Sequence, residues 1–75
     1  MSTKKIYVQI VDTLKGIQQT GSIEEPVVKG AEIQNALKHF GINYGEVDWD
    51  FSDNVRKSGK VSGTYIYINV ITGCV

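Results

Sequence analysis

A single histidine and a pair of aspartates are the residues of this 75-residue chain best suited to catalysis. His39 stands beside Phe40 near the end of a helical pattern, where a surface or capping role is favoured over that of a general base. Asp48 and Asp50 would share one face of a strand, but a catalytic carboxylate pair needs a concave site that separates the two pKa values. The sequence therefore predicts no enzyme and no catalytic residue.

Phosphate and metal chemistry have equally little support. The segment Gly59–Thr64 resembles a phosphate-binding loop, but it lacks the required glycine spacing and a Ser or Thr directly after Lys60. Cys74 is the one cysteine, so the chain has no internal disulfide and no metal-ligand spacing. It is open whether Cys74 links two chains on oxidation or lies in a frayed terminus. We expect no cofactor and no metal.

Composition limits the remaining classes. With 41% apolar residues, the chain is expected to form one small domain over residues 1–75. Eight basic and eight acidic residues cancel, so any electrostatic recognition must be local. The sequence has no apolar run of about 20 residues, which a membrane span requires. It also lacks the pattern of a signal peptide. We therefore expect an intracellular protein, cytoplasmic or nucleoid-associated, without membrane contact.

Residues 6–19 fit two kinds of secondary structure. Ile6–Val11 is rich in β-branched and aromatic side chains, as strands are. Up to Ile17, however, every apolar side chain except Val8 falls within one broad arc of a helical wheel, and Gly21 suits the end of a helix. We favour the helix and keep the strand as the alternative.

The segment Gly30–Phe40 is predicted to be a helix. Its apolar residues recur at i, i+3, i+4 and i+7, and Gly41 follows as a stop signal. Glu32 lies near the positive N-terminal end of this helix. Before it, Ser22–Pro26 is interpreted as a connection, and Val27–Val28 as a short strand.

Residues 43–59 are ambiguous. A capping pattern formed by Asn43 and Glu46 and the i, i+4 pair Asp53–Lys57 favour a helix. Against it, residues 47–51 alternate between apolar side chains and aspartates, as a half-buried strand does. We favour the helix. If the strand forms instead, the chain is an α+β domain with a small antiparallel sheet.

The segment Thr64–Ile71 is predicted to be a strand with one buried face, because β-forming side chains alternate along it. Glycines flank Lys60–Ser62 and favour a turn or wing before this strand. Tyr65 and Tyr67 would lie on its surface, where they either stack on nucleic acid bases or cover a sheet face or dimer contact.

Taken together, these segments resemble a winged helix-turn-helix domain. Gly30–Leu37 resembles its positioning helix, Val55–Val61 the end of its recognition helix leading into the wing, and Tyr65–Ile68 a strand of the wing. The resemblance implies a mainly α fold, with a three-helix core and a C-terminal β-hairpin as the wing. It also implies insertion of the third helix into the major groove of duplex DNA.

The first functional hypothesis is therefore a small DNA-binding protein, similar to a transcription regulator, that uses the helix-turn-helix and a basic wing. We expect it to act as a homodimer, because two half-sites increase specificity. The candidate nucleic-acid-binding residues are Asn43, Tyr44, Ser52, Arg56, Lys57 and Lys60.

An acidic segment favours a second hypothesis. Glu46, Asp48, Asp50 and Asp53 would oppose a phosphate lattice whose affinity derives from Lys and Arg. Trp49 is either a core residue or an aromatic anchor of a protein interface. The alternative function is a protein–protein interaction module or inhibitor that contacts its partner through Trp49, Asp50 and Asp53.

Overall fold

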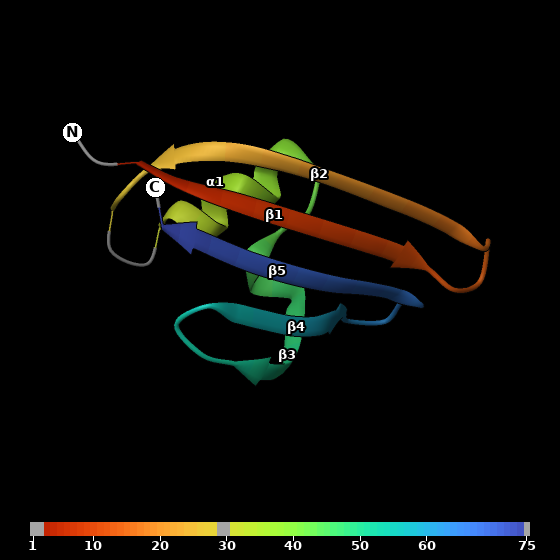
Figure 1. The fold of residues 1–75 in the computed structure, drawn as a ribbon. Helices are drawn as coiled ribbons and strands as arrows, with labels where there is room; N and C mark the ends of the chain where they lie inside the picture. The colour runs from red at the N-terminus through yellow and green to blue at the C-terminus, as the bar shows by residue number, and fades with distance from the viewer. Residues whose placement is uncertain (1–2, 29–30, 75) are drawn as a thin grey trace.

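The chain forms a five-stranded antiparallel sheet with one helix packed on one of its faces (Figure 1). The computed structural model describes residues 3–28 and 31–74. In space the strands follow the order β2-β1-β5-β4-β3. In chain order the elements are β1 (Thr3–Asp12), β2 (Ile17–Pro26), α1 (Glu32–His39), the 3-10 turn η1 (Tyr44–Glu46), β3 (Val47–Ser52), β4 (Arg56–Val61) and β5 (Ile66–Cys74).

Strands β1 and β2 form a long hairpin, so the helix predicted for residues 6–19 is wrong. The hairpin turn begins at Asp12, whose Oδ1 accepts hydrogen bonds of 3.1 Å from the N–H groups of both Leu14 and Lys15. Gly16 closes the turn with a φ of 68°, a left-handed conformation that glycine adopts without strain. These two turn residues interrupt the apolar arc, and its two halves become paired strands instead.

Strand β5 lies at the centre of the sheet, paired with β1 on one side and β4 on the other. This confirms the strand predicted for this part of the chain. Ile68 and Val70 are buried under α1, at 2% and 0% exposure. Tyr67, Asn69 and Ile71 alternate with them and point to the other face, because successive side chains of a strand alternate.

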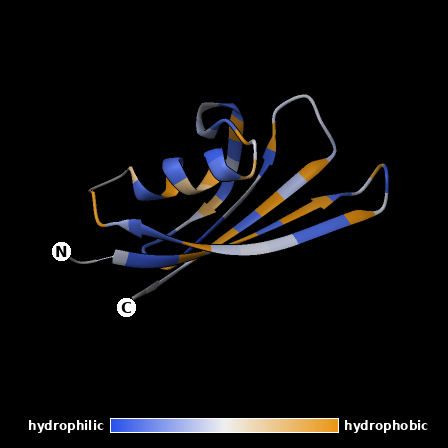
Figure 2. Cartoon of the chain, turned by 90° about the horizontal axis from the view of Figure 1, so that it is seen from above, coloured by the Kyte–Doolittle hydropathy of each residue, from blue (hydrophilic) through white to orange (hydrophobic). Residues whose placement is uncertain are grey.

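Helix α1 confirms the helix predicted before Gly41, whose φ of 75° ends it. Gly30 lies outside the described residues. Figure 2 shows α1 on one side of the sheet, with the opposite side uncovered. The hydrophobic core lies between α1 and this covered face, and it consists of Ile6, Val8, Ala36, Leu37, Val47, Ile68 and Val70.

Residues 43–59 form strands rather than the helix that we favoured. The Asn43 side chain caps the 3-10 turn η1 and nothing longer, accepting a hydrogen bond of 3.0 Å from the N–H of Gly45. Val47 then enters the core, and β3 pairs with β4 across a β-bulge between Trp49 and Phe51. The burial of Val47 and the partial burial of Trp49 on the covered face therefore favour a strand more strongly than the Asn43 cap favours a helix.

The mainly α fold with a three-helix core and a wing is thus wrong. The part of the chain that the structure describes contains one α-helix, so the helix pair of a helix-turn-helix is missing there. The α+β alternative also underestimated the sheet, because β1 and β2 supply two of its strands. Ser22–Pro26 belongs to β2 and not to a connection, and Val27–Val28 lies outside any strand.

Cys74 ends β5, and its side chain lies outside the described part of the structure.

Among residues 3–28 and 31–74, no helix has the length and apolarity that would let it cross a membrane.

Candidate binding surface

The residues predicted to bind nucleic acid are divided between the two faces of the sheet. Tyr44 packs its ring against Trp49 on the covered face, at 5.5 Å between centroids. Lys57 lies over the same indole, with its Nζ 5.9 Å from the ring centroid, and donates a hydrogen bond of 2.6 Å to Ser52 Oγ. Asn43 is engaged in capping η1. These four residues therefore stabilise the β3 side of the domain.

Arg56 and Lys60 lie instead on the open face, the side of the sheet that α1 does not cover. In the register between β4 and β5, Arg56 is opposite Ile71 and Lys60 is opposite Tyr67. The structure therefore separates Lys57 from the other two members of the predicted basic triplet.

The three residues predicted to bind a protein partner are also dispersed. Trp49 is half-buried on the covered face, and its indole N–H has no hydrogen-bond acceptor among the described residues. Asp50 is exposed at the bulge of β3. Asp53 lies in the β3–β4 turn, where its Oδ1 accepts hydrogen bonds from the N–H groups of Val55 at 2.8 Å and Arg56 at 2.7 Å.

These hydrogen bonds change the acidity of Asp53. The N–H groups of Arg56 and then Val55 stabilise the carboxylate and lower the pKa of Asp53 below its ordinary value. The side chain is fully exposed, so Asp53 acts here as the organiser of a turn. Its Oδ1 accepts both of these backbone hydrogen bonds.

The open face itself presents a more coherent set of side chains. A first row, the Tyr7 row, crosses the sheet from Tyr7 on β1 through Ile71 on β5 to Arg56 on β4. The Arg56 guanidinium carbon lies 4.9 Å from the centroid of the Phe51 ring, which continues the row onto β3. Tyr7, Phe51 and Ile71 are each between 41% and 43% exposed. The row is thus an accessible ridge of apolar surface around a positioned cation.

A second row, the Tyr67 row, runs parallel to the first. It passes from Val11 through Tyr67 to Lys60 and ends at Asp48 on β3. Tyr67 is 46% exposed. On β1, β5 and β4 the two rows are four positions apart, which corresponds to about 14 Å.

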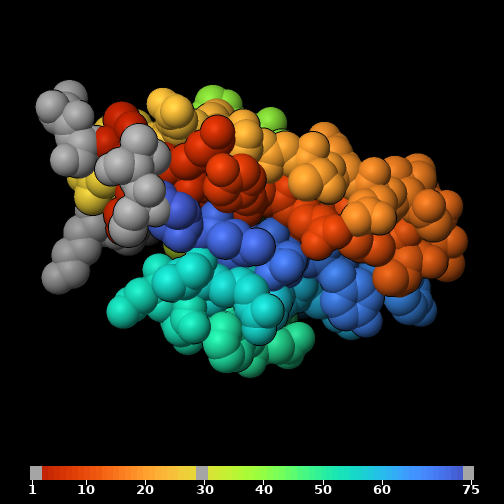
Figure 3. Space-filling model, in the orientation of Figure 1, coloured from red at the N-terminus to blue at the C-terminus, as the bar shows by residue number. Residues whose placement is uncertain are grey.

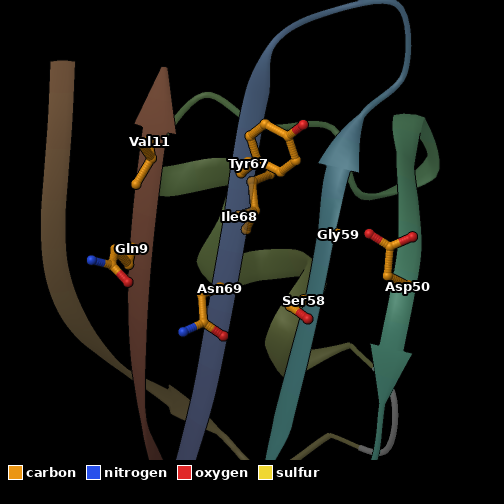
Figure 4. A pocket seen from close by; sticks show the side chains of 8 residues that line it. All are labelled: Gln9, Val11, Asp50, Ser58, Gly59, Tyr67, Ile68 and Asn69. Carbon is orange, nitrogen blue, oxygen red and sulfur yellow. The ribbon is translucent and has the colours of Figure 1, made fainter. Parts of the chain in front are cut away.

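Small polar side chains fill the space between these rows. This middle row consists of Gln9 on β1, Asn69 on β5 and Ser58 on β4, which are opposite one another in the register. Figure 4 shows that these side chains and Tyr67 border a shallow hollow of about 250 Å³, with Asp50 at its β3 side. Asn69 Oδ1 is buried there without a hydrogen-bond donor among the described residues.

Charges on the open face are mixed rather than positive. Three basic residues face three acidic ones, and the register places Lys5 opposite Glu24 and Lys60 opposite Asp48. Lys5 Nζ also lies 5.6 Å from the centroid of the Tyr7 ring. The open face therefore has aromatic rings with nearby cations, but no excess of positive charge.

The remaining candidates for chemistry lie elsewhere. His39 Nε2 is 3.1 Å from Oε1 of Glu25, which is itself only 8% exposed. This contact connects the end of α1 to β2 on the covered face. Within the described ranges, no three His, Cys, Asp or Glu side chains come together as a metal site.

Sequence reasoning missed most of the open face, namely Tyr7, Gln9, Phe51, Ser58, Asn69 and Ile71. The signal was present for the first two, because strict alternation of Ile6 and Val8 with Tyr7 and Gln9 is typical of a strand. Assigning the segment to a helix concealed it. Figure 3 shows the result in space, with strands β2, β1, β5 and β4 side by side and no helix in front of them.

Comparisons of the chain with protein-family models, curated proteins and solved structures find no match.

Proposed function

We propose that the protein is a non-catalytic protein-interaction module that binds its partner through the open face of the sheet. The observation that carries this proposal is the pair of exposed rows, the Tyr7 row with two aromatic rings and the Tyr67 row with one, on either side of a polar hollow. Tyrosine and arginine are enriched among the residues that dominate protein interfaces. The open face displays both, together with polar side chains that can complement a partner.

The Tyr7 row is organised before any partner binds. Stacking of Arg56 on Phe51 restricts a side chain that would otherwise lose much rotamer freedom on association. Tyr7 and Tyr67 have few rotatable bonds and project from two interior strands of the sheet, β1 and β5. Binding at this surface therefore costs little conformational entropy.

The charge distribution favours a protein over nucleic acid. Affinity for a phosphate backbone comes from an excess of Lys and Arg over acidic residues. The open face has no such excess, because its basic and acidic residues are equal in number. Alternating charges are instead suited to a protein surface of complementary pattern, where they set specificity and orientation. A standard interface requires about 800 Å² from each partner. The chain exposes 4957 Å² in all, so such an interface would take about a sixth of its surface.

The earlier alternative of a protein-interaction module is thus retained, but on different residues. Trp49 is replaced as the expected anchor by Tyr67 and Tyr7, because its ring is packed between Tyr44 and Lys57. Asp50 remains at the margin of the hollow. Binding of duplex DNA through a helix-turn-helix is not carried further, because the described chain lacks the helix pair.

The proposal is tested with a double variant, Tyr7→Ser with Tyr67→Ser, which removes one anchor from each row. The matched control is Tyr65→Ser, because Tyr65 is 60% exposed and precedes β5 outside both rows. Immobilised wild-type and variant proteins would capture partners from a lysate of the native cell. Each candidate would then be titrated against all three purified proteins by calorimetry.

We expect a partner whose affinity falls at least 100-fold, about 2.7 kcal/mol, with the double variant and stays within about threefold with the control. A partner bound equally by the wild-type protein and the double variant would refute the proposal. So would salt-sensitive binding of oligo(dT) that the double variant loses, since this would assign the same rings to single-stranded nucleic acid.

A further inference from the structure

The two edges of the sheet differ in how they are protected from pairing with another strand. Edge strand β3 is short, interrupted by a bulge, and contains Asp48 and Asp50. Edge strand β2 extends over ten residues and pairs with β1 at every position without a bulge. Its charged residues and its proline, Glu24, Glu25 and Pro26, are confined to its last three positions. The seven residues from Ile17 to Ile23 therefore lack the charges, prolines and bulges by which natural edge strands avoid pairing.

The hydrogen-bonding groups that β2 presents outward can be assigned. Just after β1, the N–H of Thr13 donates a hydrogen bond to the carbonyl of Tyr65. Backbone groups alternate along a strand, so those of odd-numbered residues of β1 point toward β5 and those of even-numbered residues toward β2. The odd-numbered residues of β2 pair with these even-numbered residues of β1, so their backbone groups point inward, toward β1. The backbone groups of Gln18, Thr20 and Ser22 therefore point away from the sheet, and all three residues are exposed.

We propose that a second copy of this chain occupies the β2 edge, pairing β2 with the partner's β2 in antiparallel orientation about a two-fold axis at Thr20. This inference concerns the edge of the sheet and is independent of the function proposed for the open face. The two five-stranded sheets would become continuous, with both α1 helices on the same side. Thr20 would form a hydrogen-bonded pair with the partner's Thr20, and Gln18 with the partner's Ser22.

Side-chain complementarity selects this register. It places Ile17, which is 57% exposed on the covered face, directly opposite the partner's Ile23, which is half-buried on the same face. Each two-fold dimer contains this pair twice, so both apolar side chains lose solvent contact.

Neighbouring registers lose these contacts. An axis at Ser22 would place Ile23 opposite the partner's Gly21 and Thr20 opposite the partner's Glu24. An axis at Gln18 would place Ile17 opposite the partner's Gln19 and run Ile23 past the end of the partner's strand. Of these three registers, only the axis at Thr20 therefore combines backbone pairing with an apolar match.

Cysteine crosslinking tests the axis directly. Thr20→Cys and Ser22→Cys would each be made with Cys74→Ser, and both new thiols would lie on the same exposed strand. In the proposed dimer the two Thr20 Cα atoms are about 5.5 Å apart, a distance that a disulfide spans. The two Ser22 Cα atoms are about 14 Å apart. We expect at least tenfold more crosslinked dimer from Thr20→Cys under mild oxidation. Equal yields, or none from Thr20→Cys, would overturn the proposal.

Sedimentation over a concentration series supplies the second measurement. The wild-type protein should form a dimer, and Thr20→Lys should shift the midpoint at least 100-fold toward monomer, because it places two ammonium groups at the axis. The control Ser62→Lys adds the same charge in the exposed turn after β4 and should dimerise like the wild type. A monomeric wild-type protein at about 1 mM, or no effect of Thr20→Lys, would contradict the inference.

Discussion

Tyr67 and Ile68 are neighbours in β5, yet they belong to two surfaces with different roles. Ile68 is 2% exposed beneath α1, and Tyr67 is 46% exposed on the open face. The centre of the covered face is apolar, with polar contacts such as His39–Glu25 and Lys57–Ser52 around it, whereas the open face alternates aromatic, amide, hydroxyl and charged side chains. Because a strand directs successive residues to opposite faces, each strand of this small protein serves both the core and the candidate interface.

The comparison shows where stability and binding reside. A chain of this length has a net stability of only about 4–11 kcal/mol, at roughly 0.05–0.15 kcal/mol per residue. The few buried side chains between α1 and the sheet must supply most of it. The open face contributes less and is therefore free to carry recognition. Substitutions on the two faces should separate these two properties.

The largest effect is expected from Ile68→Ala. Removing this buried side chain leaves a cavity in the hydrophobic core, so the free energy of unfolding should fall by about 2–5 kcal/mol. Urea denaturation followed by circular dichroism measures this loss. A loss below about 1 kcal/mol would mean that Ile68 does not belong to the core and that the contrast between the faces is misplaced.

A smaller loss is expected from Gly59→Ala, where β4 runs closest to β3. A Cβ atom added to Gly59 would lie 2.9 Å from the Cα of Trp49, and backbone cannot move aside as a side chain can. The expected cost is about 1–3 kcal/mol. Gly45→Ala is the matched control, because its Cβ would meet only Asn43 Oδ1 at 3.5 Å. Equal stability of the two variants would contradict this close approach.

Part of this architecture could be predicted from the sequence. Helix α1 and strand β5 were predicted because their periodicity and their end signals agree, as with Leu37 in the apolar stripe and Gly41 after it. Residues 6–19 were assigned wrongly because their apolar side chains fit both a helical arc and a strand. The pairing of β1 with β5, which decides the matter, joins residues far apart in the chain and cannot be detected from local sequence patterns.

The candidate site was less accessible to sequence reasoning. Arg56 and Lys60 were singled out for their charge and do lie on the open face. Their apolar partners are brought to them by register, as Ile71 is to Arg56 and Tyr67 to Lys60. A surface of this kind is assembled from alternate residues of separate strands, so it can be recognised only once the strand order is known.

A third prediction separates binding from stability on the open face. Tyr67→Ala should lower the free energy of unfolding by only about 0.2–1 kcal/mol, the contribution of a cross-strand pair. The same substitution should weaken the partner complex far more than it weakens the fold. Urea denaturation of Tyr67→Ala and Ile68→Ala under identical conditions compares the loss of unfolding free energy on the open face with that on the covered face, at two adjacent residues. A loss as large as that of Ile68→Ala would show that the open face is part of the core.

The smallest effect is expected from Asp53→Asn in the β3–β4 turn. The pKa of Asp53 is lowered in the folded protein by the N–H groups of Arg56 and then Val55, so the carboxylate favours folding. This contribution is present above the pKa of the unfolded chain and is lost as the pH falls through the lower folded-state pKa. Asparagine keeps an oxygen acceptor for both N–H groups but does not titrate. The urea midpoint of the wild type should therefore exceed that of the variant near pH 6 and approach it below about pH 3. A difference that does not change with pH would mean that the charge of Asp53 plays no part in the turn.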